Sequence, residues 1–190
     1  MLSTALQKTF IVVPFIREVI GMDIRKATVH DVQDMSRIHA LSWKEAYKGL
    51  VPQPYLDDLQ EDFWVTGFQN WLQNGFITAQ LIFDGSIPVG CATYGKSRDN
   101  TLPDWGEIYS FYLLPSYSGK GFSHALLTST LKDLKQAGFY NIYLWILINN
   151  ERAQSFFHNM GFQKTKDECS TEILGTCFVD IRFVICFDEE

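Results

Sequence analysis

The sequence predicts an α/β (α+β) fold in one globular domain, and three observations support this prediction. Residues 107–162 read as strand, glycine turn, helix, strand and helix. Asp84-Gly85 lies between two apolar runs and is the strongest short signal of a β-hairpin in the chain. The chain has 190 residues, of which 46% are apolar, and this suits one domain with a sizeable core.

The chain before the hairpin reads as one short strand followed by helical segments. Residues 23–27 alternate like a strand, and apolar residues recur at helical spacing over residues 30–47. Residues 52–59 place their apolar side chains on one side after a proline restart, and residues 61–74 read as a further helix.

The domain-like periodic pattern begins at Met22. We therefore expect residues 1–21 to be an N-terminal extension and residues 22–190 to form the domain. The apolar run at residues 10–16 is short and interrupted by Pro14, which does not favour a signal peptide.

Strands are predicted on both sides of the hairpin turn and further along the chain. They cover about residues 76–83, 87–95, 105–114 and 142–148, and the last of these is fully apolar, as in a central buried strand. Apolar residues at alternate positions from 177 to 187 predict a half-buried antiparallel strand at the C-terminus.

The cysteines favour a reducing compartment. Cys91, Cys177 and Cys186 lie within apolar strand-like runs, so we expect buried, reduced thiols and a cytoplasmic protein. The four cysteines form no CxxC pair and have no histidine at zinc-ligand spacing. We therefore expect no metal site.

Charge and hydropathy exclude two classes of partner. Sixteen basic and 22 acidic residues give a formal charge of −6, and there is no lysine or arginine run, so we expect no nucleic-acid partner. No apolar stretch reaches the roughly 20 residues that span a bilayer, so we expect no membrane partner.

A glycine turn at the start of a predicted helix is the feature that indicates chemistry. Gly119 and Gly121 flank Lys120 and lead into the helix that carries Leu127 and Leu131. Backbone N–H groups at a helix start carry partial positive charge and can bind phosphate oxygens. Gly-x-Gly alone fits an ordinary loop equally well, and its surroundings match neither a Walker A loop nor the Rossmann fingerprint.

Several motifs, in this order, resemble those of the GNAT N-acetyltransferases. Residues 111–127 resemble the acyl-CoA pyrophosphate loop of that family, and residues 150–162, with Asn-x-x-Ala before Phe-Phe and Gly-Phe, resemble its second signature. Residues 24–52 resemble the opening of many bacterial members. The resemblance covers about residues 22–187. It implies a GNAT fold, which is a mixed, mostly antiparallel sheet of about seven strands flanked by about four helices and splayed at the acyl-CoA site.

The resemblance also implies an activity and a set of binding residues. The activity is direct transfer of the acetyl group of acetyl-CoA to a primary amine of a small molecule, peptide or protein, and a homodimer is compatible with it. The residues implied to bind acetyl-CoA are Phe111, Tyr112, Leu113, Ser118, Gly119, Lys120, Gly121, Phe122, Ser123, Asn150, Ala153, Phe156 and Phe157. Trp43 and Tyr47 share one helix face, and they either wall the acceptor pocket or pack on the sheet.

The catalytic residues follow the family pattern in part. Glu107 lies where several members have their glutamate base, and the alternative for it is a solvated or salt-bridged strand-end glutamate. Phe157 lies at the position of the tyrosine that protonates the leaving thiolate, and it has no proton to give. Tyr117, Tyr112 and His158 are candidates for this acid by proximity in the sequence.

Other departures keep a second hypothesis open. Ser118 and Ser123 stand where the family usually has Gln or Arg and a smaller residue, although both still allow binding through backbone N–H groups. His39 is expected to be a core-edge histidine rather than a catalytic one. The second hypothesis is a catalytically degenerate domain that binds or senses acyl-CoA.

Overall fold

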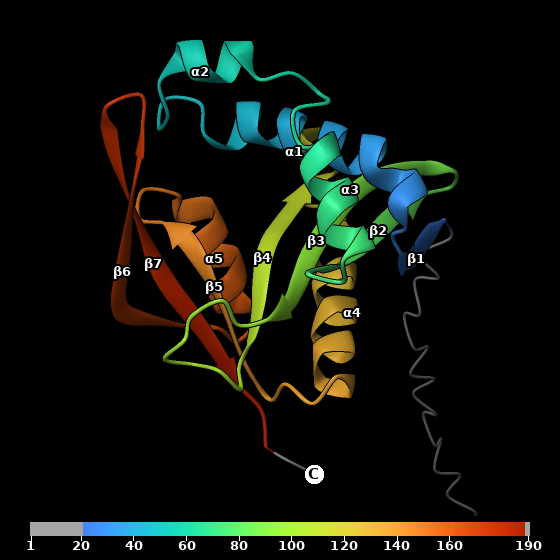
Figure 1. Ribbon diagram of the computed structural model, residues 1–190, viewed down its shortest axis with the longest axis vertical. Helices are drawn as coiled ribbons and strands as arrows, with labels where there is room; N and C mark the ends of the chain where they lie inside the picture. The colour runs from blue at the N-terminus through green and yellow to red at the C-terminus, as the bar shows by residue number, and fades with distance from the viewer. Residues whose placement is uncertain (1–20, 189–190) are drawn as a thin grey trace, which may run out of the picture.

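The computed structural model describes residues 21–188, which form a seven-stranded sheet with helices on both faces (Figure 1). The strands are β1 (Met22–Lys26), β2 (Thr78–Asp84), β3 (Ile87–Lys96), β4 (Gly106–Leu113), β5 (Asn141–Leu147), β6 (Gln163–Ile173) and β7 (Thr176–Cys186). The helices are α1 (Val32–Ala46), α2 (Gln53–Asp58), α3 (Val65–Gln73), α4 (Phe122–Gln136) and α5 (Glu151–Asn159), with 3-10 turns at Val29–Asp31 and Pro115–Tyr117.

The sheet has the order β1-β2-β3-β4-β5-β7-β6. Among the strand pairs of the described residues, β4 and β5 run parallel and the others are antiparallel, so the predicted mixed, mostly antiparallel sheet is confirmed. The described residues contain five α-helices, where about four were expected. The predicted extension lies, apart from Gly21, outside the described residues, and the domain boundary stays a prediction.

Strand β6 is the seventh strand that the GNAT resemblance implies, but no residue range was predicted for it. It is rich in charged residues, including Lys164, Lys166, Asp167 and Glu168, and this pattern hides the apolar alternation by which a strand is recognised. The strand lies at the edge of the sheet. Charged side chains on an edge strand discourage pairing with another chain, which explains the composition.

Strands β4 and β5 are paired at two residue positions. Gly106 lies opposite Ile142 and Glu107 lies opposite Tyr143, and beyond these pairs the strands diverge (Figure 1). On its other side β4 stays paired with β3 as far as Leu113. The main chain of β4 that faces β5 is therefore left without a neighbouring strand. This confirms the predicted splay.

Helices α1 and α4 cover opposite faces of the sheet. Tyr94 of β3 donates a hydrogen bond to Asp133 of α4, whereas the adjacent Thr93 is hydrogen-bonded to Ser110, which contacts His39 of α1. Neighbouring residues of a strand point to opposite faces, so the two helices lie on either side of β3.

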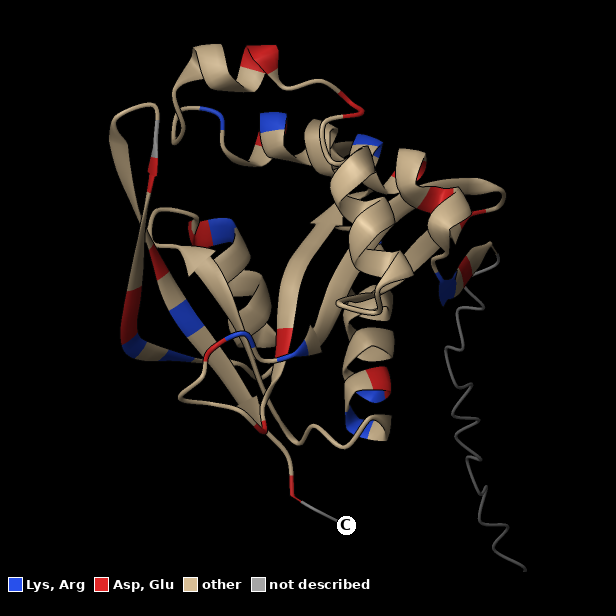
Figure 2. Cartoon of the chain, in the orientation of Figure 1, with Lys and Arg blue, Asp and Glu red and all other residues tan. Residues whose placement is uncertain are grey.

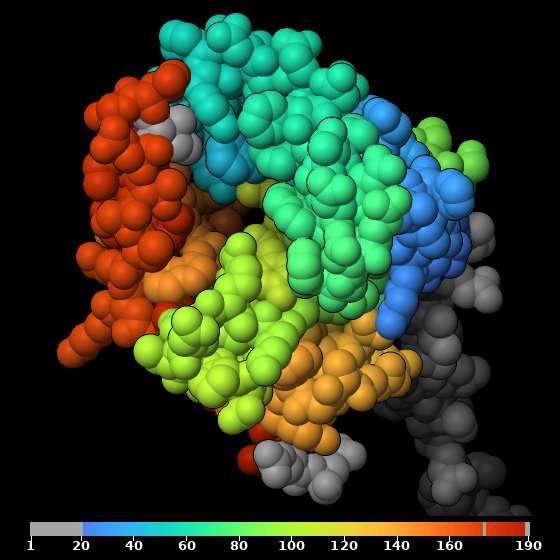
Figure 3. Space-filling model, in the orientation of Figure 1, coloured from blue at the N-terminus to red at the C-terminus, as the bar shows by residue number. Residues whose placement is uncertain are grey.

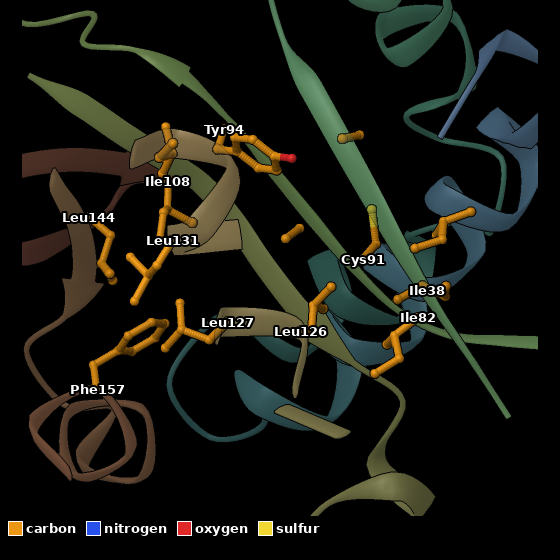
Figure 4. Close-up of a cluster of buried hydrophobic side chains, with 14 of the residues drawn as sticks. Ile38, Ile82, Cys91, Tyr94, Ile108, Leu126, Leu127, Leu131, Leu144 and Phe157 are labelled. Carbon is orange, nitrogen blue, oxygen red and sulfur yellow. The ribbon is translucent and has the colours of Figure 1, made fainter. Parts of the chain in front are cut away.

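The core on the α4 side extends to the diverging strands. Leu127 and Leu131 of α4 point toward Ile108 of β4, Leu144 of β5 and Phe157 of α5 (Figure 4). All five side chains are less than a tenth exposed. This packing fixes the positions of β4, β5 and α5 around the splay.

Two predictions about the cysteines are wrong. Cys91 is buried as expected, but Cys177 and Cys186 are exposed, because they lie at the two ends of β7 rather than in its buried middle. Strand β7 is paired on both sides, with β5 and with β6, so it offers no free edge to a second copy of the chain. The homodimer stays a prediction.

The surface carries charges of both signs. Acidic and basic residues are interspersed over α1, α4 and β6 (Figure 2). Within residues 21–188, no helix is long and apolar enough to cross a membrane, and no group of three or more His, Cys, Asp or Glu side chains could hold a metal ion.

The start of α1 is fixed by Asp31. Its carboxylate accepts hydrogen bonds from the guanidinium of Arg25, at 2.7 and 2.9 Å, and from the backbone N–H of Thr28, at 2.7 Å. Thr28 in turn caps this turn with its own side chain, which completes a capping box. The hydrogen bond from Arg25 lowers the pKa of Asp31 to about 2.

We predict that Asp31→Ala lowers the free energy of unfolding by about 1–2 kcal/mol at pH 7. Because the folded-state pKa lies below the ordinary value, this contribution is complete above about pH 4 and is lost as the pH falls toward 2. Urea unfolding of both proteins between pH 7 and about pH 3 measures it.

Asp34→Ala is the matched control. Asp34 forms a longer pair with Arg37, at 3.6 Å, with both side chains about a third or more exposed, so the expected change is below about 0.5 kcal/mol. A difference between wild type and Asp31→Ala that does not narrow below pH 4 would contradict the prediction.

Candidate functional site

A cavity lies where β4 and β5 separate. It has a volume of about 80 Å³ and is formed by β4, β5, α5 and the end of α1. Its polar side chains are Tyr47, Tyr109, Ser110, Tyr112 and Asn150, and its other walls are largely apolar. We call it the splay cavity.

A groove of about 270 Å³ continues from the splay cavity toward the glycine turn. The two share Phe111 and Phe157 among their lining residues, and the groove extends to Ser118 and Ser123. The predicted cofactor residues that line the groove are Phe111, Tyr112, Leu113, Ser118, Ser123, Asn150, Ala153, Phe156 and Phe157. The structure thus brings together residues that lie up to 46 positions apart in the sequence, from Phe111 to Phe157.

The glycine turn has the backbone that its sequence predicts. Gly119 and Gly121 have positive φ angles of 73° and 90°, which side-chain-bearing residues rarely adopt. Gly121 is the N-cap of α4 and brings no side chain to satisfy the first N–H groups of this helix. A β-carbon at Gly119 would meet nothing within 4 Å, so the turn is open to an approaching ligand. This geometry suits an anion.

Four predicted cofactor residues are absent from the described residues that line the groove, and they are the consecutive residues Gly119, Lys120, Gly121 and Phe122. Phe122 is 6% exposed and packs edge-on against Tyr117. Lys120 is exposed, and its ammonium group lies 5.3 Å from the centre of the Tyr117 ring. Phe122 can therefore contribute to ligand binding through its N–H group alone.

Asn150 and Ala153 are linked by a helix cap. The side-chain oxygen of Asn150 accepts the N–H of Ala153 at 3.1 Å, and Asn150 is the N-cap of α5. This accounts for the Asn-x-x-Ala spacing. Both residues line the splay cavity and the groove, so the cap also fixes the wall opposite β4.

Sequence reasoning missed part of the groove wall. Ser42, Glu45 and Ala46 of α1 line it, and the Ser42 hydroxyl ties α1 to β4 by donating to the carbonyl of Leu113 at 3.0 Å. Arg152 also lines it and brings a cation. The sequence could have indicated Arg152 as a groove residue, because it lies inside the Asn-x-x-Ala motif.

Tyr47 and Trp43 have different surroundings. Tyr47 lines the splay cavity, and its hydroxyl lies 3.3 Å from that of Tyr112. Trp43 packs on Tyr47 and on Trp64, with ring centres 4.6 and 5.7 Å apart. Burial raises the pKa of both Tyr47 and Tyr112, so these hydroxyls keep their protons at neutral pH.

The carboxylate of Glu107 is buried and hydrogen-bonded on both oxygens. It accepts from the guanidinium of Arg98 at 2.6 Å, the backbone N–H of Arg98 at 2.9 Å and the hydroxyl of Tyr143 at 2.9 Å. Its side chain is 2% exposed, and Glu107 is absent from the described residues that line the splay cavity and the groove. A base needs a free lone pair beside the amine or a water molecule. The role of base stays a prediction, and this geometry favours the salt-bridged alternative.

Phe157 is 5% exposed and packs against Phe111 and Phe156, with ring centres 5.6 and 5.1 Å apart. Of the three candidates for the acid, Tyr112 lines both the splay cavity and the groove. Tyr117 packs on the glycine turn and His158 is exposed on α5. Tyr112 is therefore the candidate that geometry retains.

Comparison with known proteins gives a family match. The sequence model of the acetyltransferase (GNAT) family matches residues 39–162, which is more than half of the chain. The uncharacterized N-acetyltransferase YuaI of Bacillus subtilis is 29% identical over 127 residues, which cover 67% of this chain and 72% of YuaI. A spermidine N(1)-acetyltransferase of Thermoplasma acidophilum is 22% identical over 144 residues, which cover 75% of this chain and 89% of that protein.

Solved structures share the fold. The PaiA N-acetyltransferase of Thermoplasma acidophilum, crystallised with coenzyme A, superposes with a TM-score of 0.71 at 21% identity, over 88% of this chain and 100% of that one. YncA of Salmonella typhimurium, with its cofactor acetyl-CoA, superposes with a TM-score of 0.67 at 18% identity, over 90% and 96% of the two chains. At these identities the likeness shows the fold alone.

We predict that Glu107→Gln lowers the free energy of unfolding by about 1–3 kcal/mol, because it removes the charge that Arg98 and Tyr143 contact. Half or more of the Arg98 side chain is exposed, so water compensates part of the loss. Urea unfolding measures the change, and Glu168→Gln on the exposed edge strand is the control, with an expected change below about 0.5 kcal/mol. Unchanged stability together with lost turnover would instead support Glu107 as the base.

Proposed function

The chain belongs to the GNAT acetyltransferase family, and on this premise we propose that it transfers the acetyl group of acetyl-CoA to a primary amine. The observation that carries the proposal is the continuous path from Ser118 and Ser123, which flank the glycine turn, along the groove to the splay cavity. The outer end of the path lies beside a helix start that suits phosphate, and its middle is bordered by the free edge of β4. Its inner end is lined by residues with hydroxyl groups.

Acetyl-CoA would bind along this path. The start of α4 at Gly121 would hold the pyrophosphate through backbone N–H groups, and Arg152 would add a charged contact. The pantetheine arm would hydrogen-bond to the edge of β4 near Phe111–Leu113, as an added strand does. The thioester would then lie at the inner end, in the splay cavity.

Direct attack by the amine is supported by the cysteines. Among the described residues, none of the four cysteines lines the splay cavity or the groove. Burial raises the pKa of Cys91, the one that is buried, so its thiol stays protonated and is a poor nucleophile. A cysteine acyl-enzyme is therefore not part of the proposal.

The Tyr112 hydroxyl would stabilise the departing thiolate. Its raised pKa keeps it protonated, and that pKa exceeds the value near 8.5 of an ordinary thiol, so it would donate a hydrogen bond without giving up its proton. Tyr47, hydrogen-bonded to Tyr112, orients this hydroxyl.

The acceptor would approach from the face seen in Figure 3. This face is hollowed between the segments of α2 and α3, the β3–β4 connection and the β6–β7 pair. Polyamines, amino acids, aminoglycoside-like compounds and peptide or protein amines all remain in the acceptor class. The spermidine acetyltransferase among the relatives and the net charge of −6 favour testing polyamines first. A cytoplasmic location stays a prediction.

We predict that the protein releases free thiol from acetyl-CoA in the presence of an accepted amine. A thiol-detection assay over a panel of polyamines, amino acids, aminoglycosides and peptides measures it, with mass spectrometry of the acetylated amine as confirmation. Stabilisation by acetyl-CoA without release on any acceptor would favour the alternative of an acyl-CoA-sensing domain. Neither stabilisation nor release at millimolar acetyl-CoA would defeat both hypotheses.

We predict that Gly121→Ala weakens acetyl-CoA binding about tenfold or more, because alanine at this positive φ distorts the turn that presents the N–H groups. The measurement is the thermal stabilisation by acetyl-CoA, which follows RT ln(1 + [L]/Kd). Gly138→Ala is the matched control: Gly138 follows the other end of α4 with a φ of 91°. Both variants lose stability, and equal loss of acetyl-CoA binding in the two would contradict the proposed pyrophosphate site.

A further inference from the structure

His39 is a buried histidine beside the splay cavity. It is 3% exposed and packs against Phe68 and Tyr112, with ring centres 4.8 Å away in each case. Its Nδ1 lies 2.8 Å from the carbonyl oxygen of Met35, and its Nε2 lies 2.8 Å from the hydroxyl oxygen of Ser110. The burial agrees with the expected core-edge histidine, but the contact with Ser110 connects His39 to the cavity.

The hydrogen-bond partners of His39 determine where its proton lies. A carbonyl oxygen can only accept, so Nδ1 carries the proton and donates to Met35. In the neutral ring Nε2 is then an acceptor, and the hydroxyl of Ser110 donates to it. Thr93, 2.6 Å from the same oxygen, must therefore donate to Ser110. The result is a hydroxyl whose proton points at a basic nitrogen.

Ser110 lies where the reaction would take place. It lines the splay cavity and comes directly before Phe111, where the groove from the glycine turn enters that cavity. A bulge in β4 places it there: Thr93 pairs with Ser110 and Tyr94 with Ile108, so Tyr109 is an extra residue in β4. Bulges re-aim neighbouring side chains, and this one leaves Ser110 on the side of His39.

We propose that Ser110 and His39 form the proton relay of acetyl transfer, with Ser110 touching the attacking nitrogen and His39 acting through Ser110. This inference rests on the proposed function. The amine lone pair attacks the thioester carbon, and the π electrons of the C=O bond move to oxygen. A proton passes from nitrogen to the Ser110 oxygen while the Ser110 proton moves to Nε2 of His39.

The second half of the reaction returns that proton. The C=O bond re-forms, the C–S bond breaks with its electrons on sulfur, and the thiolate takes a proton from Ser110 as His39 returns its own to Ser110. The products are an amide and a thiol, with no further reactant. The relay would thereby act as the base, a role for which Glu107 is not free because Arg98 and Tyr143 are hydrogen-bonded to it. It would also act as the acid, a role that Phe157 cannot fill because it has no hydroxyl group.

The protonation state of His39 is compatible with this role, although burial makes the ring a weaker base than a free imidazole. Burial lowers its pKa to about 4, so the ring is neutral and ready to accept a proton at pH 7. The nitrogen that loses the proton has already bonded to carbon, which makes it much more acidic than a free ammonium group. The titratable group that faces His39 from β4 is Tyr112, which stays protonated. Phe68 of α3 and Trp64, the N-cap residue of that helix, also face His39.

The test uses the full chain and the panel amine with the highest turnover. We expect Ser110→Ala and His39→Gln each to lower kcat about 100-fold, with the thermal stabilisation by acetyl-CoA unchanged. The double variant should be no slower than the slower single variant, because the two residues act as a unit. Thr130→Val, which removes a buried hydroxyl of α4 on the opposite face of the sheet, is the control and should stay within about fivefold of wild type.

Ser110→Thr keeps the hydroxyl and should restore kcat to within about tenfold of wild type, a rescue that a purely structural role of the serine would not require. Ser110→Ala with wild-type kcat, or single losses that multiply in the double variant, would overturn the relay. An acetyl group found on Ser110 by mass spectrometry without an amine would also overturn it, in favour of a serine acyl-enzyme. A wild-type protein inactive on every amine would defeat the proposed function and the relay together.

Discussion

Between β4 and β5 the sheet carries two residue pairs, so the main chain of β4 beyond Glu107 has to find partners other than a neighbouring strand. The point of separation is pinned by side chains. Glu107 and Tyr143 form the last pair, and the Tyr143 hydroxyl donates to the Glu107 carboxylate, which also pairs with Arg98 of the β3–β4 connection. A buried carboxylate with three donors resists movement, because breaking these bonds would leave a charge desolvated. Glu107 thus determines where the strands part.

Beyond that point the two sides of the opening differ in chemistry. On the α5 side, Phe111 stacks on Phe156 at 5.9 Å and meets Phe157 edge-on, so an apolar surface borders the path proposed for the thioester. On the α1 side, Ser110 and Tyr112 line the cavity, and their hydroxyls contact His39 and Tyr47. The apolar side suits the pantetheine and acetyl groups, and the polar side suits proton transfer.

The sequence predicted features that are encoded locally. The turn at Gly119 and Gly121 and the cap at Asn150 depend on residues within a few positions of each other, so spacing alone reveals them. Contacts between residues far apart in the sequence could not be predicted. Ser110 lies 71 positions from His39, and neither a serine nor a histidine indicates by itself which residue it will contact. Strand β6 was missed for a related reason, because its charges reflect its place at the edge of the sheet, which depends on the whole fold.

The difference between the apolar α5 side and the polar α1 side of the cavity explains why a phenylalanine at position 157 is compatible with catalysis. A hydroxyl there would lie within a cluster of aromatic rings, where an unsatisfied polar group is costly. Phe157 avoids that cost, and proton transfer would then be carried out by residues on the α1 side of the cavity. Its presence is therefore as compatible with an active enzyme as with a degenerate one, provided that the α1 side can both accept and return a proton. Ser110 and His39 have the donor and acceptor arrangement for both steps.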